Sequence, residues 1–227
     1  MKGDDLFMHK KLGKLMTQHQ FDDVYDATSI QFQQFIDRSK FRQLCVEFID
    51  GVKRLNIAFS NPFFNMHNYV WTDERNEKAL FVTIDRDGVI QGLYMKPFVQ
   101  YSKTDRRYTK NMFRMPVLDE WYVIWGGANE FQNYHYAYDN QRYAYDLIRM
   151  KDFKTNDTQQ HLYTNYYAYN EQVVAPCSGT VVAVVNDVLD NEIGQTNEQQ
   201  PAGNYVIIEH AYDEFSFLAH FKEGSIL

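Results

Sequence analysis

The chain has 227 residues, of which 44% are hydrophobic and 16% aromatic, so it is long enough to bury a sizeable core in one large domain or two small ones. Its formal net charge of -7 leaves no basic surplus to neutralise phosphates, which excludes nucleic acid or an anionic membrane surface as the main partner. The two cysteines, Cys45 and Cys177, lie far apart, which predicts small buried side chains rather than a disulfide framework.

The N-terminal half begins with a stretch that has a helical pattern. Its first residues, MKGDDLFMHKKLGKLM, carry scattered charges and no continuous apolar run, so they predict neither a signal peptide nor a membrane anchor. From Leu6 to about Leu55 the apolar residues recur at helical spacing. This spacing predicts several helices, with Asp26, Thr28 and Ser39 as N-caps.

After the helices the hydrophobic period changes to that of strands. We expect strands in FFNMHNYVW, in KALFVTID and in VIQGLYMKPF, the last two joined by a tight turn at Arg86-Asp87-Gly88. Helices followed by an antiparallel sheet predict an α+β domain over residues 1–102, in which the helices pack on a curved sheet.

The C-terminal half has a different character. Residues 103–115 begin with the polar and charged stretch KTDRRYTK and predict a linker. From Pro116 to Leu227 there is no helical period, and short strands are expected in WYVIW, NYHYAY, RYAYDLIRM, GTVVAVV, NYVIIEH and FSFLAHF. This half therefore predicts an all-β antiparallel sheet domain. Its long polar stretch NDVLDNEIGQTNEQQPAGN predicts a surface loop beside a groove.

One segment of this half, NYHYAYDNQRYAYD, gathers many aromatic rings around a carboxylate. Asp139 and Asn140 are good central residues for a two-residue hairpin turn, which would pair His135 with Ala144. His135 and Asp146 then become diagonal neighbours on one face, roughly 7 Å apart at the backbone and within reach of a single metal ion. The rings of the other face would pack within the domain or, as the alternative, form an amphipathic groove for a peptide or a glycan; they are Tyr134, Tyr136, Tyr143 and Tyr145.

Three stretches near the C-terminus carry a family resemblance. VVAPCSGTVVAVV, GNYVIIEH and FSFLAHF together resemble the sheet core of the lysostaphin and LytM type zinc endopeptidases, which cleave peptidoglycan cross-bridges. The resemblance covers roughly Trp121 to Leu227 and implies a zinc metallopeptidase fold, a cell-wall substrate and a location in the cell envelope or outside the cell. The N-terminal half is similar to the cone-shaped domain of the nuclear-transport-factor-two and cystatin-like superfamily.

The resemblance also implies roles for particular residues. The family holds zinc through the His and Asp of a His-x-Gly-x-Asp motif and the second His of a His-x-His strand. Aligned on Asp146, the first motif reads RYAYD, with Arg142 in the position of the histidine, and arginine has no lone pair for a metal. We therefore expect zinc to be bound by Asp146 with His135 as the replacement ligand. His220 matches the Tyr-x-His-Leu histidine that stabilises the oxyanion.

Each of these residues also has a structural interpretation. Asp146 suits an ion pair with Arg142 on the same strand face, His135 suits a hydrogen-bonded strand histidine, and His220 suits a histidine at the edge of the core. If no metal binds, the fold suits a non-catalytic module that binds peptidoglycan or a peptide. In that module Arg142 would clamp a carboxylate of a peptide stem, and the two tyrosines Tyr134 and Tyr143 would bind the rest of it.

A biotinyl or lipoyl carrier is another β-rich class with an Ala-Pro-x-x-Gly strand entry, but it needs a lysine in a tight, exposed turn. Lys151, Lys154 and Lys222 lack that setting, which argues against a carrier.

The family's His-x-His strand does not occur before Leu227, where the chain ends. We therefore expect a truncated product that holds zinc weakly, has no peptidase activity and presents an unpaired sheet edge that invites self-association.

Overall fold

The computed structural model describes residues 8–157 and 161–227. In these residues the chain forms four α-helices and three antiparallel sheets of four, two and three strands, so the predicted mixed α+β class is confirmed. The chain divides into two compact units. Unit 1 contains the described residues up to Gln100 together with Asn129–Tyr134, and unit 2 contains Tyr101–Ala128 and the rest from His135 onward.

No helix in residues 8–157 and 161–227 combines the length and the apolar character needed to cross a bilayer. The prediction that the first residues form neither a signal peptide nor an anchor falls partly on residues 1–7, which lie outside the described residues.

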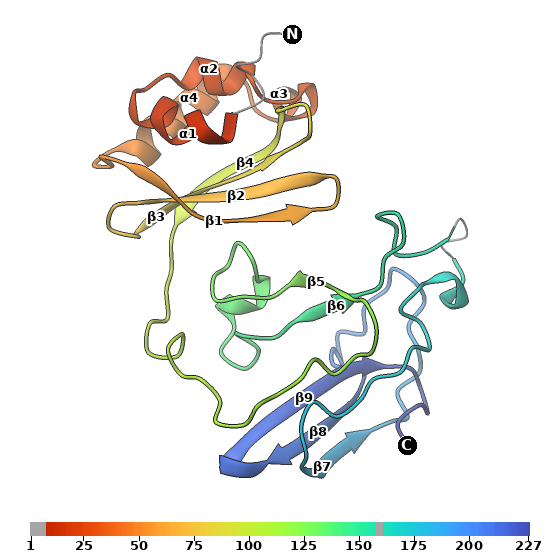
Figure 1. Ribbon diagram of the computed structural model, residues 1–227. Helices are drawn as coiled ribbons and strands as arrows, with labels where there is room; N and C mark the ends of the chain where they lie inside the picture. The colour runs from red at the N-terminus through yellow and green to blue at the C-terminus, as the bar shows by residue number, and fades with distance from the viewer. Residues whose placement is uncertain (1–7, 158–160) are drawn as a thin grey trace. The chain divides into compact units, whose positions relative to one another are not determined.

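The helices of unit 1 lie on one side of its sheet (Figure 1). Three of them bury an apolar stripe that joins the strands in a common core, whereas the third helix along the chain has no fully buried residue and packs Phe32 against that core. The four helices are α1 (Met8–Thr17), α2 (Phe21–Asp26), α3 (Ile30–Phe35) and α4 (Arg38–Ile49).

Two of these helices begin at caps other than the predicted ones. The Ser29 hydroxyl and the Asp37 carboxylate each accept a hydrogen bond from the backbone amide three residues on, at 3.3 and 2.8 Å. Both cap residues have extended backbone, which an N-cap requires. Asp26 ends α2, Thr28 follows it and Ser39 lies inside α4, so the three predicted caps are wrong.

The sheet of unit 1 is a meander in the order β1-β2-β3-β4. Its strands are β1 (Leu55–Phe63), β2 (Met66–Asp73), β3 (Lys78–Ile84) and β4 (Ile90–Pro97). The three predicted strands are confirmed as β2, β3 and β4. Strand β1 was not predicted; it is an edge strand with no fully buried residue, and it contains Pro62, which is unusual inside a strand.

Both faces of this sheet are covered within unit 1. On the helical face Trp71, Leu80 and Val82 are almost fully buried against the helices. On the other face Phe131, from the segment Asn129–Tyr134, stacks on Phe81 with ring centroids 5.9 Å apart. The chain thus leaves unit 1 after Gln100 and returns to it for six residues.

The strands of unit 2 form two sheets. The smaller pairs β5 (Tyr122–Trp125) with β6 (Asp146–Ile148), and the larger has the order β7-β8-β9. Its strands are β7 (Thr180–Val185), β8 (Asn204–His210) and β9 (Glu214–Phe221). These strands confirm the predictions for WYVIW, GTVVAVV, NYVIIEH and FSFLAHF.

His210, the last residue of β8, links the segment just before β7 to β9. Its Nδ1 lies 2.9 Å from the Ser178 carbonyl oxygen, which can only accept, so Nδ1 is the donor. Its Nε2 lies 2.7 Å from the hydroxyl oxygen of Ser216 on β9. Gly179 makes the close approach possible, because a Cβ there would collide with the Glu209 carbonyl oxygen. His210 therefore supports the sheet.

The long polar stretch between β7 and β8 contains no helix or strand, as predicted for a loop. The side chain of Asn204 links the two ends of this loop. The amide nitrogen of Asn204 donates to the Val188 carbonyl oxygen and its amide oxygen accepts from the Val188 N–H, both at 2.8 Å. Further along, the Glu223 N–H donates to the Asp190 carboxylate at 2.9 Å.

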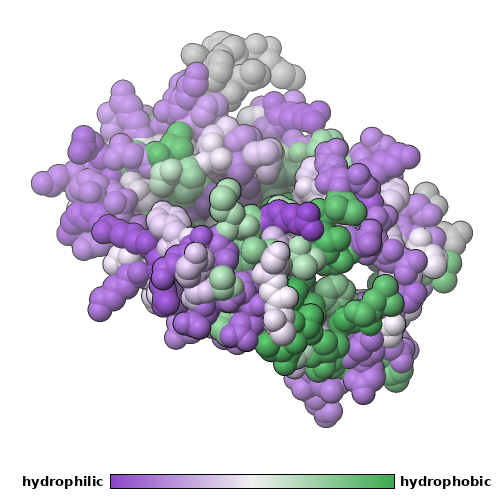
Figure 2. Space-filling view, turned by 60° about the horizontal axis from the view of Figure 1, so that its bottom comes forward, coloured by the Kyte–Doolittle hydropathy of each residue, from purple (hydrophilic) through white to green (hydrophobic). Residues whose placement is uncertain are grey.

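Strands β7 and β9 leave apolar side chains in solvent. Those more than about 45% exposed are Val181, Val182, Val184, Phe215 and Phe217. Figure 2 shows hydrophobic side chains gathered on the face of the molecule that lies at the bottom of Figure 1.

Candidate functional site

The segment NYHYAYDNQRYAYD does not form the predicted hairpin. Residues Tyr134–Ala137 form a 3-10 helix, η2, and a series of turns leads from there to β6. The predicted pairing of His135 with Ala144 is therefore wrong. The physical reason is burial, because Tyr136 is fully buried and Arg142 is 8% exposed, and an outer hairpin would leave these side chains in solvent.

The turns nevertheless bring His135 and Asp146 into direct contact. The Nε2 atom of His135 lies 2.8 Å from Oδ1 of Asp146. The His135 side chain is 9% exposed and that of Asp146 is 32% exposed, so the imidazole is held inside while the carboxylate reaches solvent. A carboxylate only accepts, so the hydrogen of this contact belongs to Nε2.

Asp146 is positioned by the small sheet of unit 2. It is the first residue of β6 and pairs with Trp125, the last residue of β5. Just before it, the Tyr145 ring packs against Gly126, where any Cβ would collide with the ring. The backbone at Asp146 is therefore held by the pairing with Trp125 and by the packing of the preceding residue, Tyr145, on Gly126.

Arg142 faces a cluster of partners of its own. Its guanidinium carbon lies 3.5 Å from the centre of the Tyr101 ring, and its Nε donates to the Tyr136 carbonyl oxygen at 3.0 Å. Its ion pair is with Asp139, whose side chain is 91% exposed. The guanidinium group is therefore in contact with an aromatic ring, a backbone carbonyl oxygen and a carboxylate.

Asp105 joins two of the predicted groove tyrosines. Its carboxylate accepts hydrogen bonds from the Tyr136 hydroxyl at 3.0 Å and from the Tyr143 hydroxyl at 2.8 Å. Burial, reinforced by this carboxylate, raises the pKa of Tyr136 to about 12. The same hydroxyl accepts from the Tyr101 N–H at 2.8 Å. No sequence pattern pointed to Asp105, which lies in the polar stretch predicted as a linker.

The remaining candidate residues are exposed. His220 occupies a β-bulge in β9 with a φ of 65°, and its N–H donates to the Ala202 carbonyl oxygen at 3.2 Å. Tyr134 is 48% exposed and Tyr143 is 41% exposed. Tyr134 belongs to unit 1, whereas His135, Arg142, Tyr143, Asp146 and His220 belong to unit 2.

Two candidate metal ligands, His135 and Asp146, lie side by side. Within residues 8–157 and 161–227 no three or more His, Cys, Asp or Glu side chains form a group that could hold an ion. Both cysteines are free thiols. Cys45 is buried, which raises the pKa of its thiol to about 12, whereas Cys177 is half-buried, so the prediction of burial holds only for Cys45.

Comparison of the chain with protein-family models, with curated proteins and with solved structures finds no match.

Proposed function

We propose that this chain is a peptidoglycan-endopeptidase-like protein of the lysostaphin and LytM type, preceded by a cystatin-like or nuclear-transport-factor-two-like α+β domain. The observation that carries the proposal is the 2.8 Å contact between His135 and Asp146, the two residues expected to bind zinc. The sequence resemblance of the β7, β8 and β9 stretches supports the peptide of a cell wall as the substrate.

The pair fits a zinc ion in the chemistry of its donors. Zinc binds neutral imidazole nitrogen and carboxylate oxygen, and when bound it activates a water for attack on an amide. His135 and Asp146 would supply one donor of each kind. In the present contact a hydrogen lies between Nε2 and Oδ1, and it must leave Nε2 before that nitrogen can bind a cation.

Two ligands are fewer than the three that a catalytic zinc site uses, so we expect weak binding that strengthens as pH rises. Calorimetric titration with zinc chloride in two buffers of different ionisation enthalpy measures both the affinity and the protons released. His135→Asn and Asp146→Asn should each weaken binding more than about tenfold. His161→Asn, at an exposed histidine, is the matched control. Equal zinc affinity in the wild type and His135→Asn would contradict the proposal.

Digestion of muropeptides tests the reaction itself. Hydrolysis of a cross-bridge amide by any form of this protein should disappear in Asp146→Ala. Equal and measurable hydrolysis in the two proteins would remove Asp146 from the mechanism.

A second candidate function follows from the ligand count. A non-catalytic module with the same fold would bind peptidoglycan or a peptide without metal. Its binding surface would include the exposed tyrosines Tyr143 and Tyr145 of unit 2, since the guanidinium of Arg142 is already engaged by Asp139 and Tyr101. Pull-down on purified peptidoglycan in the presence of a chelator distinguishes the two functions, because only the second predicts undiminished binding with no hydrolysis.

We also propose that β7 pairs with β7 of a second copy. The strand has the sequence TVVAVV, without a charge or a proline to protect an exposed edge, and an antiparallel self-pairing places no like charges opposite each other. Sedimentation velocity over a range of concentrations should show a dimer that Val182→Lys abolishes. A monomer at every concentration would contradict this part of the proposal.

A further inference from the structure

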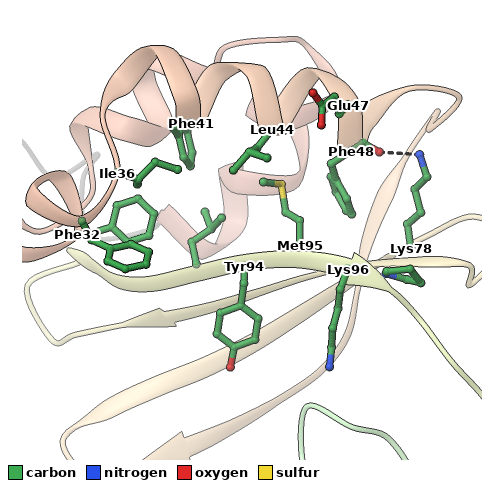
Figure 3. Close-up of a pocket in the computed structure, with 13 residues that line it drawn as sticks. Phe32, Ile36, Phe41, Leu44, Glu47, Phe48, Lys78, Tyr94, Met95 and Lys96 are labelled. Atoms are coloured by element: carbon green, nitrogen blue, oxygen red, sulfur yellow. Dashed lines mark hydrogen bonds between the residues drawn. The ribbon is translucent and has the colours of Figure 1, made fainter.

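Unit 1 contains a cavity between its helices and its edge strand. It has a volume of about 420 Å³ and opens between α3, α4 and β4. Small-molecule sites commonly have volumes of about 300–1,000 Å³, so the cavity is large enough for a small ligand. Figure 3 shows the side chains of Phe41, Leu44 and Phe48 descending from α4 toward β4.

The interior of the cavity is apolar. The side chain of Met95 points from β4 toward the helices, whereas those of Tyr94 and Lys96 point to the opposite face of the sheet (Figure 3). Strand β4 therefore contributes backbone and apolar side chains to the wall. Because a polar ligand would lose its hydration here without gaining partners, such a wall selects an apolar group.

One cation lies at the rim of this apolar space. The Lys78 ammonium donates to the carbonyl oxygens of Phe48 and Asp50, at 2.8 and 2.7 Å, just where α4 ends. Both partners are neutral carbonyls, so within the described part of the chain no carboxylate balances the ammonium charge. An ammonium has three N–H donors, and these two contacts use two of them.

The carboxylate that lines the same cavity is directed elsewhere. Glu47 is exposed on α4 and accepts a hydrogen bond from the Gln43 amide at 2.8 Å, one turn back along the helix. Lys78 is therefore the charged group available to a ligand that enters the cavity.

We propose that this cavity binds a single-chain carboxylate amphiphile, with its alkyl chain between α4 and β4 and its carboxylate on Lys78. The apolar wall takes the chain, and the remaining N–H of Lys78 takes the head in a charge-assisted hydrogen bond. One ammonium matches one negative charge, which favours a carboxylate over a doubly charged phosphate monoester. The site is separate from the His135–Asp146 pair, and its test does not depend on the function proposed for that pair.

Calorimetry with the full chain at neutral pH tests the proposal, using decanoate, decan-1-ol and decyltrimethylammonium below their aggregation concentrations. Decanoate should bind one-to-one and at least about tenfold more tightly than decan-1-ol, because only the anion gains the charged contact. Decyltrimethylammonium should bind most weakly, since its charge repels Lys78. Equal affinities for decanoate and decan-1-ol would overturn the assignment of Lys78.

Two variants of α4 locate the site. Leu44→Trp fills the cavity and should weaken decanoate binding more than about tenfold, as expected when the space for a ligand is lost. Val46→Trp is the matched control, because Val46 is 49% exposed on the same helix and does not line the cavity. Equal loss or equal retention of binding in the two variants would place the ligand elsewhere and overturn the proposal.

A variant of Lys78 tests the charge. Lys78→Gln keeps N–H donors for the carbonyl groups of α4 but removes the charge, so decanoate and decan-1-ol should then bind alike. Unchanged binding of decan-1-ol to this variant shows that the cavity has kept its shape. A preference for decanoate that persists in Lys78→Gln would contradict the proposal.

Discussion

The guanidinium carbon of Arg142 lies 3.5 Å from the centre of the Tyr101 ring, although the two residues are far apart in sequence. An arginine packed on an aromatic face, with its Nε on the backbone of Tyr136, is a structural element of unit 2. Arg142 is therefore a side chain that organises the segment leading to Asp146.

Replacing Arg142 by methionine should lower the free energy of unfolding by about 2–3 kcal/mol, because the cation–π contact and a hydrogen bond to a buried carbonyl are both lost. Arg142→Lys keeps the charge but loses the planar group, so it should recover only part of this stability. Urea unfolding followed by circular dichroism measures both variants. Full stability in Arg142→Met would show that the Tyr101 contact contributes nothing.

Removing the Tyr136 hydroxyl should destabilise the fold by about 1–3 kcal/mol, because Asp105 loses a donor and the Tyr101 N–H loses its acceptor. The pKa of Tyr136 is raised from 10.0 to about 12, so its neutral form stabilises the fold below pH 10. This stability is lost as pH rises from 10 toward 12. Stability measured against alkaline pH should therefore fall more steeply in the wild type than in Tyr136→Phe. Parallel curves would contradict the assignment.

Gly179→Ala should lower the free energy of unfolding by about 2–4 kcal/mol. The new Cβ would collide with the Glu209 carbonyl oxygen and lie 2.8 Å from Nδ1 of His210, and neither can move without disturbing β8. Gly92→Ala is the matched control, because the nearest side-chain atom to its Cβ would lie 4.0 Å away. Thermal unfolding of the two variants measures the difference, and equal melting temperatures would show that β8 yields to the extra methyl group.

Glu214 should make the fold sensitive to acid. The backbone N–H of Lys110, followed by the amides of Asn111, holds the pKa of this carboxyl below its usual value of 4.5. A lowered pKa means that the stabilisation is present above pH 4.5 and is lost as pH falls through the folded-state pKa. Glu214→Gln should therefore flatten the acid side of the stability curve. An unchanged slope would show that the segment 110–111 is held by other contacts.

The local sequence pattern correctly predicted strands in which buried and more exposed residues alternate. In β8 the apolar residues Val206 and Ile208 are buried on one face, which is the signal that the pattern detects. The strand prediction for the aromatic segment around His135 was wrong, because contacts with distant residues decide the structure of this segment. Its tyrosines favour strands, but the Tyr101 ring and the Asp105 carboxylate, more than thirty residues earlier, draw Arg142 and Tyr136 inward. Contacts between segments so far apart leave no periodic trace in the sequence.

The sequence predicted correctly that His135 and Asp146 lie close together, although the predicted hairpin was wrong. Their spacing along the chain is short enough for several kinds of turn to bring them into contact, and the turn that forms places Nε2 2.8 Å from Oδ1. Sequence proximity thus limited the distance between the two residues, whereas the path of the backbone depended on partners outside the segment.

The side chain of Asn204, which reproduces the hydrogen bonds of a paired strand with Val188, has a consequence for how this protein can change over time. These hydrogen bonds hold together the two ends of the long loop between β7 and β8. The carboxylate of Asp190 adds another hydrogen bond, which it accepts from the Glu223 N–H. Beyond these points, doubling the length of a flexible connection costs only about 0.6 kcal/mol in closure entropy. Insertions or deletions between Glu192 and Pro201, which lie inside the contacts of Asn191 and Ala202, are therefore cheap. The tip can diversify, or accept a grafted peptide epitope, while β7 and β8 keep their register.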